Sequence, residues 1–171
     1  MVTYVYFWGH NQYGTNLGTE CLSQWYDRPF THNGVTYPTC EHWMMYHKAM
    51  LFNDVETAQK ILRTSTPKDV KRLGRQVRNF DAKKWDENKY NIVKQGNLLK
   101  FSQHKDLHDY ICHLSKNEIQ FVEASPYDKI WGIGMRASDP RAKYPNQWLG
   151  ENLLGKALTE VRNQLIKKQS E

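Results

Sequence analysis

The stretch that organises this chain runs Thr39-Cys40-Glu41-His42-Trp43-Met44-Met45-Tyr46-His47-Lys48 and follows directly on Pro38. It predicts a helix, because the Thr39 hydroxyl can accept a backbone N–H of the first turn. Apolar side chains are spread around this helix, as in a helix that is buried on most sides. Glu41 and Lys48 nevertheless share one face, two turns apart. A carboxylate and an ammonium on such a face must either pair or open onto a polar cleft, and both alternatives stay open.

Length and composition predict one domain over residues 1–171. A chain of 171 residues is long enough to bury a core of normal size. Its hydrophobic content of 39% and charged content of 25% are ordinary for a soluble globular protein. The aromatic content of 13% suits either a tight core or a pocket that stacks on flat ligands. The formal net charge of +6 favours an anionic partner, such as a nucleotide, a sugar phosphate or nucleic acid.

The cysteines and histidines indicate neither a disulfide framework nor a metal site. Cys21, Cys40 and Cys112 are odd in number and form no CxxC motif, so we expect reduced thiols in a cytoplasmic protein. His104, His108 and Cys112 share one helix face, but three groups on one helix suit a tetrahedral metal poorly. We therefore expect no metal and no other cofactor. The apolar N-terminus is too short for a membrane span and lacks the basic region of a signal peptide.

Periodicity and turn residues divide the chain into helices and a few strands. Strands are expected over 3–8 and 119–123, with a hairpin that turns at Asn33-Gly34. Helices are expected from Thr39, over 55–63, from Pro67, and over 82–104, 105–114 and 149–168. Residues 129–134 are predicted to form a strand or an extended loop, and 9–18 and 136–147 to form loops. Gly155 inside the last helix costs roughly 1 kcal/mol relative to alanine, so another group is expected close to its backbone.

Three charged residues each have a structural and a functional interpretation. Lys89 lies on the apolar side of helix 82–104, where it either covers apolar surface with its stem or binds an anion. Asp128 lies in a turn, where it either caps its own backbone or addresses a sugar or a base beside Trp131. Glu41 either complements the helix dipole or belongs to a site. Spacing favours the structural interpretation of Lys89 and does not raise Glu41 or Asp128 above theirs.

Short motifs follow one another along nearly the whole chain. In order, they are Phe7-x-Gly9, Leu22-Ser23-Gln24-Trp25-Tyr26, Gly34-Val35-x-Tyr37, Glu41-His42-Trp43-Met44-Met45-x-x-Lys48-Ala49, Leu73-Gly74-Arg75, Trp85, Gly96-Asn97-x-x-Lys100-Phe101, Val122-Glu123-Ala124-Ser125-Pro126-x-Asp128-x-Ile130-Trp131-Gly132-Ile133-Gly134 and Gly150-x-Asn152-Leu153-Leu154-Gly155. This series resembles the YbiA-like, or NADAR, family. The resemblance implies a helix-rich α+β domain with a small antiparallel sheet or hairpins.

The resemblance also implies an enzyme that cleaves the N-glycosidic bond between ribose and a base. Two substrate classes are implied: phosphoribosylamino-pyrimidine intermediates of riboflavin synthesis, and ADP-ribose attached to guanine, which includes ADP-ribosylated nucleic acid. The residues carried over are Glu41, Lys48, Trp85, Glu123, Asp128, Trp131, Gly132 and Asn152. The resemblance further links Lys48 to a Schiff base with opened ribose.

The implied reaction suits these residue types. Cleavage of a ribosyl C–N bond develops oxocarbenium character, which a carboxylate stabilises, and hydrolysis needs a base for water. Glu41 and Asp128 are candidates for these two roles. A lysine desolvated among methionine and phenylalanine side chains has a lowered pKa and can attack a sugar aldehyde, which suits Lys48. Arg75 and Lys89 are candidates for holding phosphate, and Trp131 could stack the base.

Two departures and one alternative function accompany the resemblance. Met45 stands where many relatives carry Gln, and Ser23-Gln24-Trp25 stands where many carry Ser-Asn-Phe. The alternative is a non-catalytic module that binds ADP-ribose or NAD in the same pocket, although a pure binder needs no buried acid and amine together. A nucleic-acid-binding module is less favoured, because no basic stripe or RNA motif is visible. No membrane partner is expected.

Overall fold

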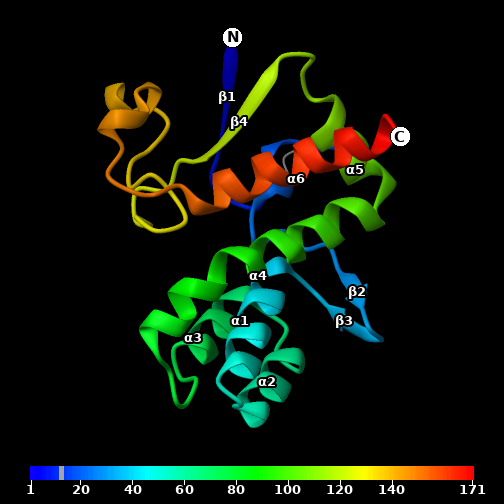
Figure 1. Cartoon of the computed structure of the whole chain (residues 1–171), viewed down its shortest axis with the longest axis vertical. Helices are drawn as coiled ribbons and strands as arrows, with labels where there is room; N and C mark the ends of the chain where they lie inside the picture. Colours follow the sequence, from blue (N-terminus) through cyan, green and yellow to red (C-terminus); the bar gives the residue numbers. More distant parts are fainter. Residues whose placement is uncertain (12–13) are drawn as a thin grey trace. The chain divides into compact units, whose positions relative to one another are not determined.

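The structure of the chain is a computed structural model that describes residues 1–11 and 14–171 (Figure 1). The described residues form two units. The first unit combines Met1–Ser23 with Phe101–Glu171, and the second unit is Gln24–Lys100. The prediction of one domain over residues 1–171 stays a prediction. The helices and two small sheets confirm the α+β class.

The second unit is built around α1 (Cys40–Leu51). The Thr39 hydroxyl accepts the backbone N–H of His42 at 3.2 Å, which confirms the predicted start of this helix. Two further helices pack against α1: α2 (Val55–Leu62) and α3 (Pro67–Gly74). The longest helix, α4 (Ala82–Gln103), begins in this unit (Figure 1). All four helices lie close to their predicted bounds, because local capping and periodicity define them.

A hairpin of β2 (Phe30–His32) and β3 (Val35–Tyr37) leads into α1. Its two turn residues both take left-handed backbone angles, with φ of 51° at Asn33 and 78° at Gly34. These angles are those of a tight hairpin turn that asparagine and glycine tolerate, so the predicted hairpin is confirmed. Trp43 of α1 packs in one hydrophobic cluster with Phe30 and Tyr37 of the hairpin. Its indole Nε1 donates a 2.7 Å hydrogen bond to the carbonyl oxygen of Ile92, which ties α1 to α4.

The first unit contains the second sheet, in which β1 (Val2–Phe7) pairs with β4 (Glu118–Glu123). This pairing is parallel, from Val2 opposite Glu118 to Phe7 opposite Glu123. Antiparallel pairing, as predicted for a small sheet, holds only for the β2–β3 hairpin. The strands β1 and β4 lie far apart in the sequence, so no local turn reveals their direction. Two helices complete the unit: α5 (Lys105–His113) and α6 (Leu153–Gln169), and α6 packs against both β4 and α5.

Irregular segments of the first unit depart from the prediction in two places. Residues 129–134 form bends and contain no strand, so the loop alternative is right and the strand alternative is wrong. The final helix begins at Leu153 rather than near 149, because Asn152 takes a left-handed φ of 55° that no helix continues.

The remaining loops carry short 3-10 turns. These are η1 (Thr19–Leu22), η2 (Pro140–Lys143) and η3 (Pro145–Gln147), and the last two lie inside the predicted loop 136–147. The predicted loop 9–18 contains Gln12 and Tyr13, which lie outside the described residues. Among the helices of the described segments, none is both long and apolar enough to cross a membrane.

Candidate active site

The start of α1 holds Glu41 in a buried position. Glu41 is only 3% exposed, and its backbone N–H donates a 3.0 Å hydrogen bond to the carbonyl oxygen of Gln24. The amide of Asn97 on α4 donates to Gln24 Oε1 at 2.9 Å and accepts from the Cys40 thiol at 3.5 Å. This chain of polar contacts fixes the first turn of α1 against α4, and therefore fixes the direction in which the carboxylate of Glu41 leaves the helix.

Two turns further along α1, the amine of Lys48 is held by a carbonyl and two aromatic rings. Its Nζ donates a 2.8 Å hydrogen bond to the carbonyl oxygen of Gly74. The same atom lies 4.8 Å from the ring centroid of Phe80 and 5.6 Å from that of Trp85. Aromatic faces attract a cation but do not solvate it as water does. The amine is therefore placed in surroundings that can accommodate both its charged and its neutral form.

Three effects act on the pKa of Lys48. Burial lowers it, because a charged amine loses hydration. The carboxylate of Glu41 raises it, and the guanidinium of Arg75 lowers it. The net direction is downward. Glu41 and Lys48 therefore interact electrostatically on one face of α1, as their spacing predicts, and the amine of Lys48 releases its proton more readily than an exposed lysine does.

The close approach of α3 to α1 depends on Gly74. A Cβ atom built at this position would lie 1.9 Å from the sulfur of Met45. Glycine thus lets the end of α3 come near enough for its carbonyl oxygen to reach Lys48. Met45 is only 7% exposed and fills the space over Gly74. Met45, which stands where many relatives carry Gln, therefore helps to hold the carbonyl oxygen of Gly74 that accepts from Lys48.

The two predicted phosphate ligands differ in their surroundings. Arg75 follows directly on α3, is exposed, and acts on the pKa of Lys48. Lys89 on α4 has a side chain that is 12% exposed, and its Nζ lies 2.8 Å from Asp86 Oδ1. An amine already paired with a carboxylate in this way is a weaker candidate for an anion than the exposed guanidinium. Both phosphate roles stay predictions.

The first unit brings together Glu123, Gly132 and Asn152. The side-chain oxygen of Asn152 accepts from the backbone N–H of Glu123 at 2.9 Å, and the backbone N–H of Asn152 donates to the carbonyl oxygen of Gly132 at 3.1 Å. A Cβ at Gly132 would lie 2.8 Å from the carbonyl oxygen of Glu123 and 3.0 Å from that of Asp128. The sequence thus uses glycine where three backbone segments meet, and asparagine ties the end of β4 to the start of α6.

The carboxylate of Asp128 holds the turn that precedes Trp131. Its Oδ1 accepts the backbone N–H groups of Ile130 at 2.9 Å and Trp131 at 2.8 Å. The hydroxyl of Ser125 accepts the backbone N–H of Asp128 at 3.1 Å. This is the structural interpretation considered for Asp128, and the turn presents the half-buried Trp131. A catalytic role for Asp128 stays a prediction.

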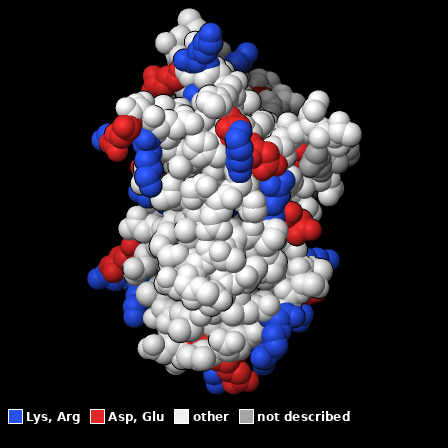
Figure 2. Space-filling view, turned by 90° about the vertical axis from the view of Figure 1, so that its right-hand side faces the viewer, with Lys and Arg blue, Asp and Glu red and all other residues white. Residues whose placement is uncertain are grey.

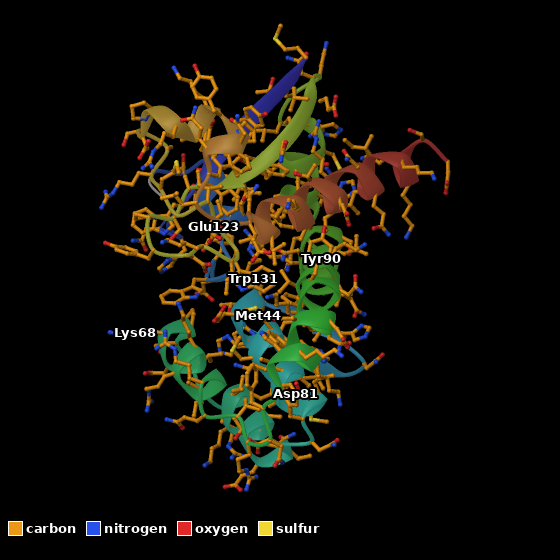
Figure 3. All side chains as sticks on the ribbon, turned by 60° about the vertical axis from the view of Figure 1, so that its left-hand side comes forward. Met44, Lys68, Asp81, Tyr90, Glu123 and Trp131 are labelled. Carbon is orange, nitrogen blue, oxygen red and sulfur yellow. The ribbon has the colours of Figure 1, made fainter. Side chains whose placement is uncertain are left out.

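The predicted site residues thus form two groups, one in each unit. Figure 3 labels Met44 on α1 and Asp81 at the start of α4 in the second unit, and Glu123 and Trp131 in the first unit. In the second unit, Lys48 is linked to Glu41, Arg75 and Trp85 by charge or ring contact. The convergence of Glu41, Lys48 and Asp128 on one pocket stays a prediction.

Sequence reasoning assigned no role to two residues that touch the amine of Lys48. Gly74 belongs to one of the motifs, but a pattern of side chains cannot reveal a contact that its backbone carbonyl oxygen makes. Phe80 lies between Asn79 and Asp81 and belongs to no periodic apolar pattern. The metal interpretation of His104, His108 and Cys112 finds no support: within residues 1–11 and 14–171, no group of three or more His, Cys, Asp or Glu side chains could hold a metal ion.

Comparison with known proteins identifies the family of this chain. The family model of the NADAR domain matches residues 6–166. The chain is 43% identical to N-glycosidase R617 of Acanthamoeba polyphaga mimivirus, over 94% of this chain and 95% of that protein. It is 30% identical to N-glycosidase YbiA of Escherichia coli, over 91% and 87%. The solved structure of the E. coli protein YbiA superposes with a TM-score of 0.77 and 26% identity, covering 99% of this chain and 88% of that one. The chain belongs to the NADAR domain family, which includes N-glycosidases.

Proposed function

We propose that this protein is an N-glycosidase that hydrolyses the C–N bond between ribose and a nitrogenous base. The substrate carries the ribose either as ribose phosphate or as ADP-ribose. The two classes are phosphoribosylamino-pyrimidines and ADP-ribosylated guanine, the latter free or in nucleic acid. The names of the relatives support the bond type, and the chemistry of the second unit supports the route.

One observation carries the proposal: the amine of Lys48 is desolvated, while the carboxylate of Glu41 acts on it from the same buried helix. A protein that only binds its ligand gains nothing from a buried acid beside an amine of lowered pKa, because burying both groups costs free energy. An enzyme gains a neutral nucleophile and a negative charge next to it. This pairing therefore favours catalysis over the alternative of a non-catalytic ADP-ribose or NAD binder.

The proposed reaction runs through Lys48. The neutral amine forms a bond to C1 of the ribose as the bond from C1 to the base breaks, and the base leaves with that electron pair and gains a proton. The ring oxygen then leaves C1, which produces a Schiff base. Water adds to C1, the amine is released, and the sugar leaves as ribose phosphate or ADP-ribose. Both bond-breaking steps place positive charge at C1, which Glu41 stabilises.

The remaining residues are proposed to bind and activate. Arg75, exposed at the end of α3, suits a phosphate of the substrate, because guanidinium groups bind phosphate oxygens through paired hydrogen bonds. In the first unit, Trp131 offers a ring face for a base, and Asp128 is the proposed base for water. The fixed turn around Asp128 supports a rigid placement of these two side chains.

The surface charges bear on the choice between a small substrate and nucleic acid. Figure 2 shows Lys and Arg side chains interspersed with Asp and Glu on the visible face, rather than gathered in a basic stripe. A protein that tracks a nucleic-acid backbone gathers its positive charge along one path. The visible face therefore offers no continuous basic path for an extended strand.

The proposal is tested by release of the base. Purified protein is incubated with a phosphoribosylamino-pyrimidine and, separately, with an oligonucleotide that carries ADP-ribosylated guanine, and the free base is quantified by mass spectrometry. Borohydride is added to parallel samples, because it reduces a Schiff base to a stable adduct. We expect base release from at least one substrate and an adduct located on Lys48.

Two variants control this experiment. Lys48→Met removes the amine with a similar volume and is expected to abolish the adduct and slow release at least about a hundredfold. Lys60→Met changes an exposed lysine that pairs with Glu56 on α2, and this variant is expected to behave as the unaltered protein. Full turnover by Lys48→Met without any adduct would exclude the covalent route. Binding of both substrates without release of base would favour the non-catalytic binder.

A further inference from the structure

The ring of Phe80 stands beside the amine of Lys48 and is open to solvent. Its centroid lies 4.8 Å from Lys48 Nζ, and the residue is 48% exposed. Its other neighbour is Phe52, at 5.4 Å between ring centroids in an edge-to-face arrangement. Phe52 is only 5% exposed, so one side of the pair belongs to the core while Phe80 presents apolar surface to the outside. A flat ligand that covered this ring would remove apolar surface from water.

The segment that carries Phe80 is anchored on its N-terminal side. The backbone N–H and the guanidinium of Arg78 both donate 2.9 Å hydrogen bonds to the carboxylate of Asp54, whose side chain is fully buried. Asn79 then takes a left-handed φ of 62°, which turns the chain sharply. A buried carboxylate and a non-glycine residue with a left-handed φ each cost free energy. The surrounding interactions must therefore stabilise this conformation of the segment.

The segment is anchored equally on its C-terminal side. Asp81 caps α4, since its Oδ1 accepts the backbone N–H groups of Lys83 at 3.0 Å and Lys84 at 3.3 Å. Figure 3 labels Asp81 at this point of α4. Only Asn79 and Phe80 lie between the two anchors. The position of the Phe80 ring is therefore built into the fold and is not that of a loose loop side chain.

We propose that Phe80, rather than Trp131 of the first unit, is the platform on which the leaving base of the substrate stacks while Lys48 reaches the ribose. This inference rests on the proposed function. Phe80 lies next to the amine of Lys48, and the base is bonded to C1, the atom that this amine is proposed to attack. A planar base bonded to the carbon that Lys48 attacks lies within reach of a ring 4.8 Å from that amine. Trp85, 5.6 Å from the same amine, supplies a second aromatic face.

The chemistry of Phe80 determines which substrates benefit. A phenyl ring has no hydrogen-bonding group, so it rewards flatness and not the identity of the base. Pyrimidines and purines gain the stacking contact, whereas a ribosyl group linked to a non-planar amine does not. Phe80 is therefore a specificity-determining residue for aromatic leaving groups, and its loss should affect substrate binding more than the chemical step.

Kinetics of three variants test the inference. Phe80→Leu keeps an apolar side chain but removes the ring, Phe80→Tyr keeps the ring, and Val55→Ala trims another exposed apolar residue of the same unit. We expect Phe80→Leu to raise KM for the base-bearing substrate about tenfold or more, with kcat within about twofold. Phe80→Tyr and Val55→Ala should retain the KM of the unaltered protein. An unchanged KM in Phe80→Leu, with its thermal midpoint preserved, would overturn the inference.

A binding measurement separates this inference from the proposed function. In the Lys48→Met protein, which cannot turn over by the proposed route, dissociation constants are measured for guanosine monophosphate and for ribose phosphate. The platform predicts tighter binding of the molecule that carries a base, and predicts that adding Phe80→Leu removes this advantage. If the unaltered protein releases no base but the advantage depends on Phe80, the proposed function fails and the platform stands. If base is released and no advantage depends on Phe80, the platform alone fails.

Discussion

The Nζ atom of Lys48 donates a 2.8 Å hydrogen bond to the carbonyl oxygen of Gly74, the last residue of α3. This contact joins two helices through the group that the proposed reaction requires. Because a carbonyl oxygen accepts from both the charged and the neutral amine, the bond orients Nζ without deciding its protonation. Burial, Glu41 and Arg75 decide it instead. The site therefore separates the placement of the nucleophile from the control of its charge.

The pH dependence of base release should report on these neighbours. The rate should rise with pH as Lys48 loses its proton, and the rise should occur below the ordinary lysine pKa of 10.5, because burial lowers the pKa. Glu41→Gln removes the charge that raises the pKa, so the rise should move to lower pH. Arg75→Gln removes a charge that lowers the pKa, so the rise should move to higher pH. Profiles of kcat/KM against pH measure both shifts, and shifts in the same direction would contradict this account.

Asp54 should stabilise the fold through Arg78. Its pKa is lowered, chiefly by the hydrogen bond from Arg78. Asp54→Asn should lower the free energy of unfolding by about 1–3 kcal/mol, because it removes the buried charged acceptor to which Arg78 and Thr57 donate. Glu56→Gln, which changes an exposed partner of the same Arg78, should cost at most about 0.5 kcal/mol.

The contribution of Asp54 should disappear in acid. A carboxyl group whose pKa is lower in the folded state stabilises the protein above its unfolded-state pKa of about 3.9, and this stability is lost as pH falls toward the folded-state pKa. Urea unfolding of the unaltered protein and of Asp54→Asn should therefore differ most at neutral pH and progressively less below about pH 4. A difference that stayed constant with pH would show that the carboxylate charge is not the cause.

Gly155 should not tolerate a methyl group. A Cβ there would lie 2.2 Å from the carbonyl oxygen of Phe121 and 2.4 Å from the side chain of Asn152. This confirms the prediction that another group lies close to the backbone of the last helix. Although alanine favours helices, Gly155→Ala should lower the free energy of unfolding by about 1–3 kcal/mol, because α6 must move away from β4. An increase in the thermal midpoint would refute this packing.

Asn152 should be sensitive to both its backbone and its side chain. Its φ of 55° favours asparagine or glycine, and its amide donates to Phe121 O at 3.0 Å and accepts from Glu123 N at 2.9 Å. Asn152→Gly keeps the backbone but leaves two buried groups without partners, so it should cost about 2–4 kcal/mol. Asn152→Asp keeps only the acceptor. Chemical denaturation should place both variants below the unaltered protein, and a neutral Asn152→Gly would show that the side chain is dispensable.

The sequence by itself determined the local elements of this protein. The N-cap at Thr39, the turn at Asn33-Gly34 and the helix from Pro67 are each defined by residues within one turn of each other, so their outcome needs no distant partner. The same holds for Glu41 and Lys48, which share a face because the helix repeat places them there. The order of the motifs along the chain is likewise a property of the sequence alone, and it indicates the family.

Only the tertiary structure decided the parallel pairing of β1 with β4 and the surroundings of Lys48. Strand direction depends on how distant segments meet, and Asn152 ends the helical pattern early because its side chain bridges to β4. The pKa of Lys48 is lowered by burial and by Arg75, which follows α3, and periodicity within α1 contains neither influence. Desolvation and ring contact are properties of the packed fold, and for that reason Phe80 carried no signal until its ring was seen beside the amine.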